Sequence, residues 1–314
     1  DAVVIVISNG AITMKKEVEE QKEWLASVRQ QDNNVESTMG ALRALPARIR
    51  GIFIGSESGV DLYDELSRSL GGFPTNAAET SVARRDKYPM GETIRAAGLR
   101  AVKQRLCRDW ACEGRAFCQE ELKEQWCVLK PCKSAGTDGV YIAKSTAEAS
   151  RCFGEILNSA NVFGEVNSAV LVQEFLAGRE YVVDSVCING AHKCTAIWEY
   201  DKREANGASF VYYGMRLFQT RQGDREEALV DYVFKCLDAL GVRHGPSHAE
   251  VIWLENDDEP CLVEVGCRPH GGNGTFVDMC DPVIGYNQLS VLLDSQQGMD
   301  FYRLPSRPSR FRGG

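Results

Sequence analysis

The chain has 314 residues, a net charge of −8 and 12 cysteines. Its 44% hydrophobic and 25% charged residues are typical of a soluble globular protein, and its length allows two or three lobes around a substantial core. The acidic balance disfavours nucleic acid or an anionic membrane as a partner, and no apolar run approaches the roughly 20 residues of a membrane helix. The cysteines form no C-x-x-C pair, which favours reduced thiols in a cytoplasmic protein.

The first 85 residues alternate strand and helix signals. The polar stretch before residue 31 is rich in helix formers, and apolar residues from residue 60 recur at helical spacing. A Gly/Ser loop at residues 55–59 follows a strand signal, where open α/β sheets bind ligands, although a simple turn is the commoner interpretation. The predicted strands are residues 2–7 and 51–55, and the predicted helices are residues 15–31, 40–50 and 60–70.

The middle of the chain mixes helices with short strands. Asp86 is placed to cap a helix that ends at Gly98. A turn that contains glycines separates two strands near residue 136, and an amphipathic helix follows it. The predicted elements are a strand at 99–104, a helix at 108–126, a strand at 126–131, a turn at 132–145 and a helix at 146–160.

The last third is dominated by strands. Residues 168–200 read as three strands joined by a loop and by an "INGAHK" turn, and residues 225–241 have the apolar face of a helix. "EVIWL" and "CLVEV" then read as a hairpin around the polar "ENDDE". The Pro- and Arg-rich residues 302–314 are expected to be loosely held.

Two glutamates interrupt the apolar strands of this hairpin. If the hairpin turns about Asp257, Glu250 lies directly opposite Glu264, and opposed residues share one face of the sheet. Paired carboxylates repel each other, and burial makes this worse. Mg²⁺ resolves the conflict because it binds carboxylate oxygen together with substrate phosphate. The alternative is that one glutamate faces solvent or meets an arginine.

A lysine and a flexible loop precede the hairpin. Lys130 ends an apolar strand, where a buried ammonium group needs an anion. Ser134, Gly136, Thr137 and Gly139 follow in a loop whose backbone N–H groups can approach phosphate oxygens. Taken alone, this loop is more often a plain hairpin turn, and the sequence has neither a Walker A motif nor G-x-G-x-x-G.

The order of these features resembles a known family. Lys87 at a helix start, the strand lysine, the Ser/Gly loop, "QEFLAGRE" at 173–180 and the glutamate hairpin with "RPHGG" occur in sequence. This set resembles the ATP-grasp superfamily, and within it the carboxylate–amine ligases, including L-amino-acid ligases and carnosine-synthase-like enzymes. Phosphoribosylglycinamide formyltransferases of the same fold are similar as well. The likeness covers roughly residues 87–273.

The resemblance implies an α/β (α+β) ATP-grasp fold in which two lobes grip ATP. The lid lobe with the phosphate loop is expected at residues 86–173 and the C-terminal lobe with the metal site at 174–314. A partial N-terminal α/β region, residues 1–85, would precede them. Relatives of this kind are often dimers, so a homodimer is an open alternative.

The resemblance also implies the roles of individual residues. Glu250 and Glu264 would hold Mg²⁺, with Mn²⁺ as an alternative ion, and Arg268 would stabilise the transferring phosphoryl group or bind an acyl phosphate. Gly266 departs from the family pattern, which has Asn as a further metal ligand there, and Lys133 stands where a neutral residue is more usual. The implied ATP contacts are Lys87, Lys130, Ser134, Gly136, Thr137 and Gly139 for phosphates, Glu174, Phe175 and Leu176 for adenine, and Glu180 for ribose.

The implied activity is an ATP- and Mg²⁺-dependent ligase. The γ-phosphoryl group would activate a small-molecule carboxylate, expected to be that of an amino acid, and an amine would attack the acyl phosphate. Two alternatives stay open: a nucleotide-binding module without turnover, favoured by Gly266, and formyl or carboxyl transfer to a small amine. His248 and His270 are either supporting groups of the site or ordinary structural histidines. Asp201, Lys202, Tyr212 and Arg216 either line an acceptor pocket or belong to a solvated connection.

Overall fold

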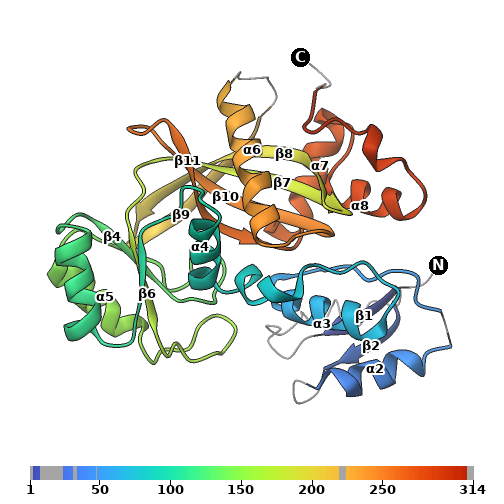
Figure 1. The fold of residues 1–314 in the computed structure, drawn as a ribbon, viewed down its shortest axis with the longest axis horizontal. Coiled ribbons are helices and arrows are strands. Elements are labelled where there is room, and N and C mark those ends of the chain that lie inside the picture. Colours follow the sequence, from blue (N-terminus) through green and yellow to red (C-terminus); the bar gives the residue numbers. More distant parts are fainter. Residues whose placement is uncertain (1–2, 8–23, 31–33, 47, 219–223, 310–314) are drawn as a thin grey trace.

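A computed structural model of the chain describes residues 3–7, 24–30, 34–46, 48–218 and 224–309. Three sheets organise them (Figure 1). A parallel pair near the N-terminus is followed by a four-stranded and a five-stranded antiparallel sheet. The strand orders are β1-β2, β3-β6-β4-β5 and β11-β10-β7-β8-β9.

The N-terminal region joins β1 (Val3–Ile7) and β2 (Trp24–Arg29) with α2 (Val35–Arg43) and α3 (Val60–Leu70). Met39, Leu42, Leu62 and Leu66 form its small core. Short 3₁₀ turns, η1 (Glu57–Gly59), η2 (Ala78–Thr80) and η3 (Val82–Arg84), lead out of it.

A buried ion pair anchors this region to the five-stranded sheet's helix layer. Arg84 is fully buried and donates to Asp64 Oδ2 at 2.6 Å and to the carbonyl of Leu240 at 2.8 Å. Asp64 lies on α3, and Leu240 lies just beyond α6 (Asp224–Ala239). The contact therefore fixes the N-terminal region against the larger lobe.

The four-stranded sheet carries its own core. Leu129, Val170 and Val172 of the sheet pack with Phe153 of α5 (Thr146–Ile156) and with Phe117. Phe117 lies in one of two π-helical turns, η4 (Trp110–Gly114) and η5 (Phe117–Glu121). The strands are β3 (Gln104–Cys107), β4 (Cys127–Lys130), β5 (Tyr141–Ala143) and β6 (Val170–Glu174).

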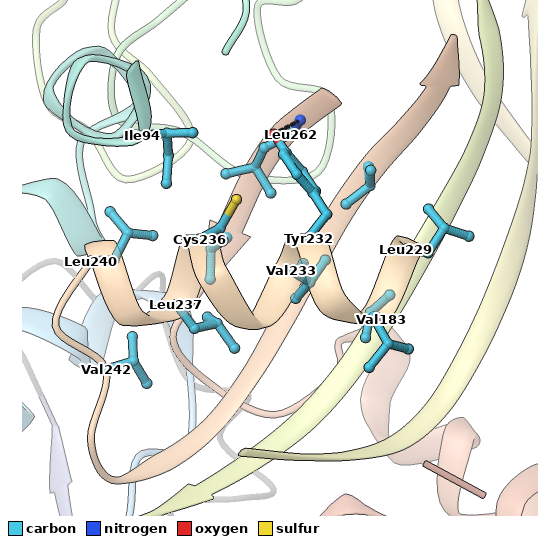
Figure 2. Packing of buried hydrophobic residues seen from close by; sticks show 14 of the residues in the cluster. Ile94, Val183, Leu229, Tyr232, Val233, Cys236, Leu237, Leu240, Val242 and Leu262 are labelled. Carbon is cyan, nitrogen blue, oxygen red and sulfur yellow. Dashed lines mark hydrogen bonds between the residues drawn. The ribbon is translucent and has the colours of Figure 1, made fainter. Parts of the chain in front are cut away.

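The five-stranded sheet is covered by helices on both faces. Alternate β7 residues point to opposite faces, so Val183 packs beneath α6 while Val182 packs against Phe276 of α7. Figure 2 shows the first of these layers, with Leu229, Val233 and the other α6 residues against the sheet. The strands are β7 (Gly178–Ile188), β8 (Ala191–Ala205), β9 (Ala208–Leu217), β10 (Gly245–Leu254) and β11 (Glu259–Gly266). The other helices are α4 (Lys87–Ala96), α7 (Thr275–Val283), α8 (Gln288–Gln296), η6 (Gly272–Gly274) and η7 (Phe301–Arg303).

Several sequence predictions differ from the structure. The helix predicted at 40–50 lies earlier in the chain, as α2 (Val35–Arg43). The predicted helix at 15–31 is wrong over 24–29, which form β2 and pair in parallel with β1; residues 15–23 lie outside the described part. The predicted strand at 51–55 joins no sheet, although Ile54 is buried in the main core. Of the predicted strand at 99–104, only the last residue, Gln104, lies in a strand, where it pairs with Gln173.

Other predictions of local structure are confirmed. Asp86 caps α4 through Tyr88 N, and the helices and strands from Cys127 to Gly266 follow the predicted order, except that β9 was not predicted. All 12 cysteines are free thiols. Among the described residues, no helix is long and apolar enough to cross a membrane.

Candidate active site

The register of the five-stranded sheet aligns its polar side chains on one face. Glu250 on β10 pairs with Glu264 on β11 and with Val182 on β7, so all three share a face. Glu180 lies two residues before Val182 and points the same way. Lys202 Nζ on β8 reaches this face and contacts Glu180. One surface of the sheet thus collects charges from four strands.

The predicted opposition of Glu250 and Glu264 is confirmed, but its origin differs. Leu254 pairs with Glu259, so the hairpin turns between Asn256 and Asp257 rather than about Asp257. A regular ladder from that turn would place Val263 opposite Glu250. A β-bulge at Val263 shifts the register by one residue and brings Glu264 into that position.

Lysines balance the acidic groups. Lys202 Nζ lies 2.5 Å from Glu180 Oε1 and 3.2 Å from Glu250 Oε2, and Lys87 Nζ lies 2.9 Å from Glu264 Oε2. Burial opposes the ionisation of Glu250, yet Lys202 holds its pKa well below the usual value. Burial and the charge of Glu250 raise the pKa of Glu180 to about 8. The two carboxylates that share Lys202 therefore have opposite pKa shifts, and Glu250 is the one that is ionised in this largely buried site.

Lys130 differs from the other two lysines. It is 4% exposed, and within the described part of the chain its ammonium group makes no hydrogen bond and no ion pair within 4 Å. Burial lowers the pKa of Lys130 to about 8, against the opposing charge of Glu264. A buried cation without a close partner indicates a site for an anion.

The Ser/Gly loop turns back above these lysines. Gly136, Thr137 and Gly139 all have φ between 63° and 66°, the left-handed region that a tight turn requires. Ser134 accepts a hydrogen bond from Lys87 Nζ through its carbonyl at 2.9 Å. Its hydroxyl donates to Asp138 at 2.7 Å, and Asp138 also accepts from the backbone of residue 162. The loop is thus tied both to the lysine and to the following segment.

These groups surround one cavity of about 420 Å³, within the usual range of small-ligand pockets of about 300–1,000 Å³. Gly139 and Arg268 are not part of its lining. Gly139 packs on Pro131, which lies 2.9 Å from the position of an added Cβ. Of the residues proposed from sequence, the cavity is lined by Lys87, Lys130, Ser134, Gly136, Thr137, Glu174, Phe175, Leu176, Glu180, Glu250 and Glu264.

The cavity has an apolar end and a charged end. Leu176 packs with Cys261 and Leu254 near the start of β11, and the Glu174 carboxylate accepts from Arg100 Nη1 at 2.9 Å and from Lys103 N at 2.7 Å. The strand then runs through Leu262 to Glu264, at about 3.4 Å per residue. The apolar end and the charged end of the cavity therefore succeed each other along β11.

Arg268 lies beyond the charged end. Its Nε donates to Glu57 Oε2 at 3.0 Å, and Arg85 Nη1 lies 3.5 Å from Glu57 Oε1. A Cβ at Gly266 would lie 2.9 Å from Arg268 Cζ and 3.0 Å from Glu57 Oε2. The missing side chain at Gly266 thus makes room for the Arg268–Glu57 pair.

Two charged residues of the site were not assigned a role from sequence. Lys202 was considered only as part of a possible acceptor pocket, although it lies two residues after Tyr200 and hence on the same face. Its ammonium group is 5.2 Å from the Tyr200 ring and 4.7 Å from the Tyr212 ring. Glu57 lies in the Gly/Ser loop, whose sequence gives no sign of its distant partner Arg268.

Residues 124–276 match the family model described as the ATP-grasp domain. Dapdiamide A synthase of Enterobacter agglomerans is 35% identical over 269 residues, which are 83% of this chain and 59% of that protein. The chain thus spans about three-fifths of that relative's length.

Solved structures show the same fold. The L-amino acid ligase from Bacillus licheniformis superposes with a TM-score of 0.74 at 17% identity, over 98% of this chain and 71% of the other. The biotin carboxylase domain of Hydrogenobacter thermophilus 2-oxoglutarate carboxylase, solved with MgADP, gives a TM-score of 0.67 at 16% identity, over 99% and 67%. The predicted ATP-grasp fold is confirmed by these likenesses.

Proposed function

Because residues 124–276 match the model of the ATP-grasp domain, we propose that the chain is a member of the ATP-grasp superfamily. It would be an ATP- and Mg²⁺-dependent ligase that joins the carboxylate of an amino acid to an amine. ADP and phosphate would be released. The names of two similar proteins, a dapdiamide synthase and an L-amino acid ligase, support this reaction class. The observation that carries the proposal is the opposition of Glu250 and Glu264 beside three lysines at one end of a cavity.

The acidic pair fits a divalent cation. Carboxylate oxygen is the donor that Mg²⁺ prefers, and Mn²⁺ accepts the same ligands. Glu250 and Glu264 are mostly buried, and both stay ionised because lysines face them. When bound, the ion would neutralise charge on the terminal phosphates of ATP.

The remaining residues would bind and orient ATP. Lys130, which forms no ion pair with any described residue, and Lys87 would contact phosphate oxygens. The backbone of Phe175 and Leu176 would face adenine at the apolar end, and Glu180 would face the ribose. Gly136 and its neighbours would cover the phosphates through backbone N–H groups.

The chain's contribution to the reaction is positioning and charge. A carboxylate becomes a good acyl donor only after phosphorylation, and no side-chain nucleophile is needed for that step. Arg268, beyond the glutamate pair, would stabilise the transferring phosphoryl group. The loop from Ser134 to Gly139 would exclude water from the acyl phosphate before the amine attacks.

Isotope transfer tests this proposal directly. The protein is incubated with ATP, Mg²⁺ and pairs of amino acids whose carboxylates carry ¹⁸O, and ADP, phosphate and amide products are followed by mass spectrometry. We expect one ¹⁸O atom to appear in the released phosphate, because the amine displaces the phosphate from the acyl carbon. Formation of AMP in place of ADP would contradict the proposal.

Matched variants separate the site from the rest of the surface. Glu264→Gln should abolish turnover, whereas Glu155→Gln on the exposed face of α5 should leave it unchanged. A protein that binds ADP equally well with and without Mg²⁺, and releases no phosphate with any pair, would instead be a nucleotide-binding module. Gly266, which supplies no third metal ligand, is the feature in favour of that second candidate.

A further inference from the structure

A buried carboxylate behind the cavity has no role in the reaction described so far. Asp184 lies on β7 beneath α7 and is 1% exposed. Its oxygens accept hydrogen bonds from His248 Nδ1 at 2.9 Å, from His270 Nδ1 at 2.7 Å and from Trp198 Nε1 at 2.6 Å. Burial disfavours its ionised form, but the two histidines hold the pKa of Asp184 far below the usual value.

One of these histidines reaches the proposed metal site. His248 shares the β10 face with Glu250, and its Nε2 lies 3.5 Å from Glu250 Oε1. Because Asp184 binds Nδ1, the opposite ring nitrogen is directed at Glu250. The imidazole ring of His248 thus connects Asp184 to the carboxylate of Glu250.

The other histidine belongs to the segment that carries Arg268. His270 follows Arg268 by two residues, and its Nε2 lies 3.3 Å from the Tyr200 hydroxyl. Its backbone N–H donates to Gln288 Oε1 at 2.8 Å. The two histidine rings also contact each other edge to face, with centroids 4.5 Å apart.

The three groups are close enough to suggest a metal site, since their ligand atoms lie within 4.8 Å of one another. The individual distances argue for hydrogen bonds instead. Two ligands of one tetrahedral zinc ion lie about 3.3 Å apart, given Zn–N and Zn–O bonds of about 2.0–2.1 Å. Here both Nδ1 atoms lie within 2.9 Å of the Asp184 carboxylate.

We propose that Asp184 is a positioning residue. It orients Glu250 through His248, and it orients the segment that carries Arg268 through His270. A single buried anion then orients both the metal-binding carboxylate and the arginine beyond it. The part that concerns Glu250 rests on the proposed function. Partners of this kind behind a metal ligand typically change metal affinity 10–100-fold when they are lost.

Two variants and one control test the proposal. Asp184→Asn removes the charge that holds both rings. His248→Asn keeps a donor where Nδ1 was, and hence the contact with Asp184, but loses the nitrogen that faces Glu250. Ser185→Ala is the control, because Ser185 is the neighbouring buried residue and loses a hydrogen bond of 2.6 Å to Ser247 between the same two strands.

The first readout is ADP binding by calorimetry over a range of Mg²⁺ concentrations. We expect the Mg²⁺ concentration for half-maximal enhancement to rise at least tenfold in Asp184→Asn and His248→Asn, with ADP binding in the absence of Mg²⁺ unchanged. Ser185→Ala should match the wild-type chain. The second readout is amide hydrogen exchange of residues 267–272 without nucleotide, which should accelerate in Asp184→Asn only.

The outcomes separate the two proposals. Wild-type Mg²⁺ dependence in a folded His248→Asn chain, or equal changes in Asp184→Asn and Ser185→Ala, overturns the positioning role. If Asp184→Asn does not fold, His248→Asn decides alone. If Mg²⁺ has no effect on ADP binding by the wild-type chain, the proposed function fails, and hydrogen exchange still decides whether Asp184 holds the Arg268 segment.

Discussion

Replacement of Lys130 by Met should stabilise the nucleotide-free protein while weakening ATP binding. Burial lowers the pKa of Lys130 from 10.5 to about 8, so folding disfavours its charged form. Each tenfold change in proton affinity corresponds to about 1.4 kcal/mol, which gives a cost of about 3 kcal/mol at pH 7. This destabilisation is fully present below pH 8, where Lys130 is charged in both the folded and the unfolded chain. It disappears as pH rises towards 10.5, because the unfolded chain then also loses the lysine proton. It is therefore about 2 kcal/mol at pH 9.

Urea unfolding of Lys130→Met and of the wild-type chain at pH 7 and pH 9 measures this difference. We expect the variant to be more stable than the wild-type chain by about 3 kcal/mol at pH 7 and by about 2 kcal/mol at pH 9. ATP affinity should fall by one to two orders of magnitude, as for a lost hydrogen bond to a charged group. Lys235→Met, on the exposed face of α6, is the control and should change neither quantity. A destabilised Lys130→Met chain, or a stability gain independent of pH, would refute the argument.

Three further changes test the surroundings of the site. Gly266→Asn introduces the Asn of the ATP-grasp pattern but should lower turnover at least tenfold, because the new side chain displaces Arg268; steady-state kinetics with unchanged ADP binding would support this. Lys202→Met leaves two buried carboxylates without their cation and should reduce the free energy of unfolding by about 3–5 kcal/mol, a loss that Mg²⁺ with ADP should partly reverse in thermal melts. Arg84→Met strands the buried Asp64 carboxylate and should cost a similar about 3–5 kcal/mol in urea unfolding, without altering ADP affinity of the folded chain.

Two parts of the site were predicted from local chemistry, whereas the other candidate residues came from the resemblance to the ATP-grasp superfamily. A lysine at the end of an apolar strand and two glutamates equally spaced about a turn are patterns within a few residues of each other. The hairpin prediction succeeded even though the turn is centred half a residue earlier, because the bulge at Val263 compensates for that difference. The sequence contains no sign of this bulge.

The parts that were missed depend on contacts between distant segments. Glu57 and Arg268 are 211 residues apart, and Lys202 is 48 residues from Glu250. The expected helix at 15–31 failed for a related reason. Residues 24–29 gain a parallel partner in β1, and tertiary pairing overrides helix propensity, which is a weak preference.

The charges of the site also explain why nucleotide and metal should bind together. Among the described residues, glutamates hold Lys87 and Lys202, whereas Lys130 has no carboxylate within 4 Å. ATP alone would have to compete with these carboxylates for the lysines and would meet their negative charge. A cation at Glu250 and Glu264 would replace the lysines as the counter-charge of these carboxylates. The lysines would then be able to bind phosphate oxygens. The same residues therefore favour the metal–nucleotide complex over either component, which is the coupling that the ADP titrations measure.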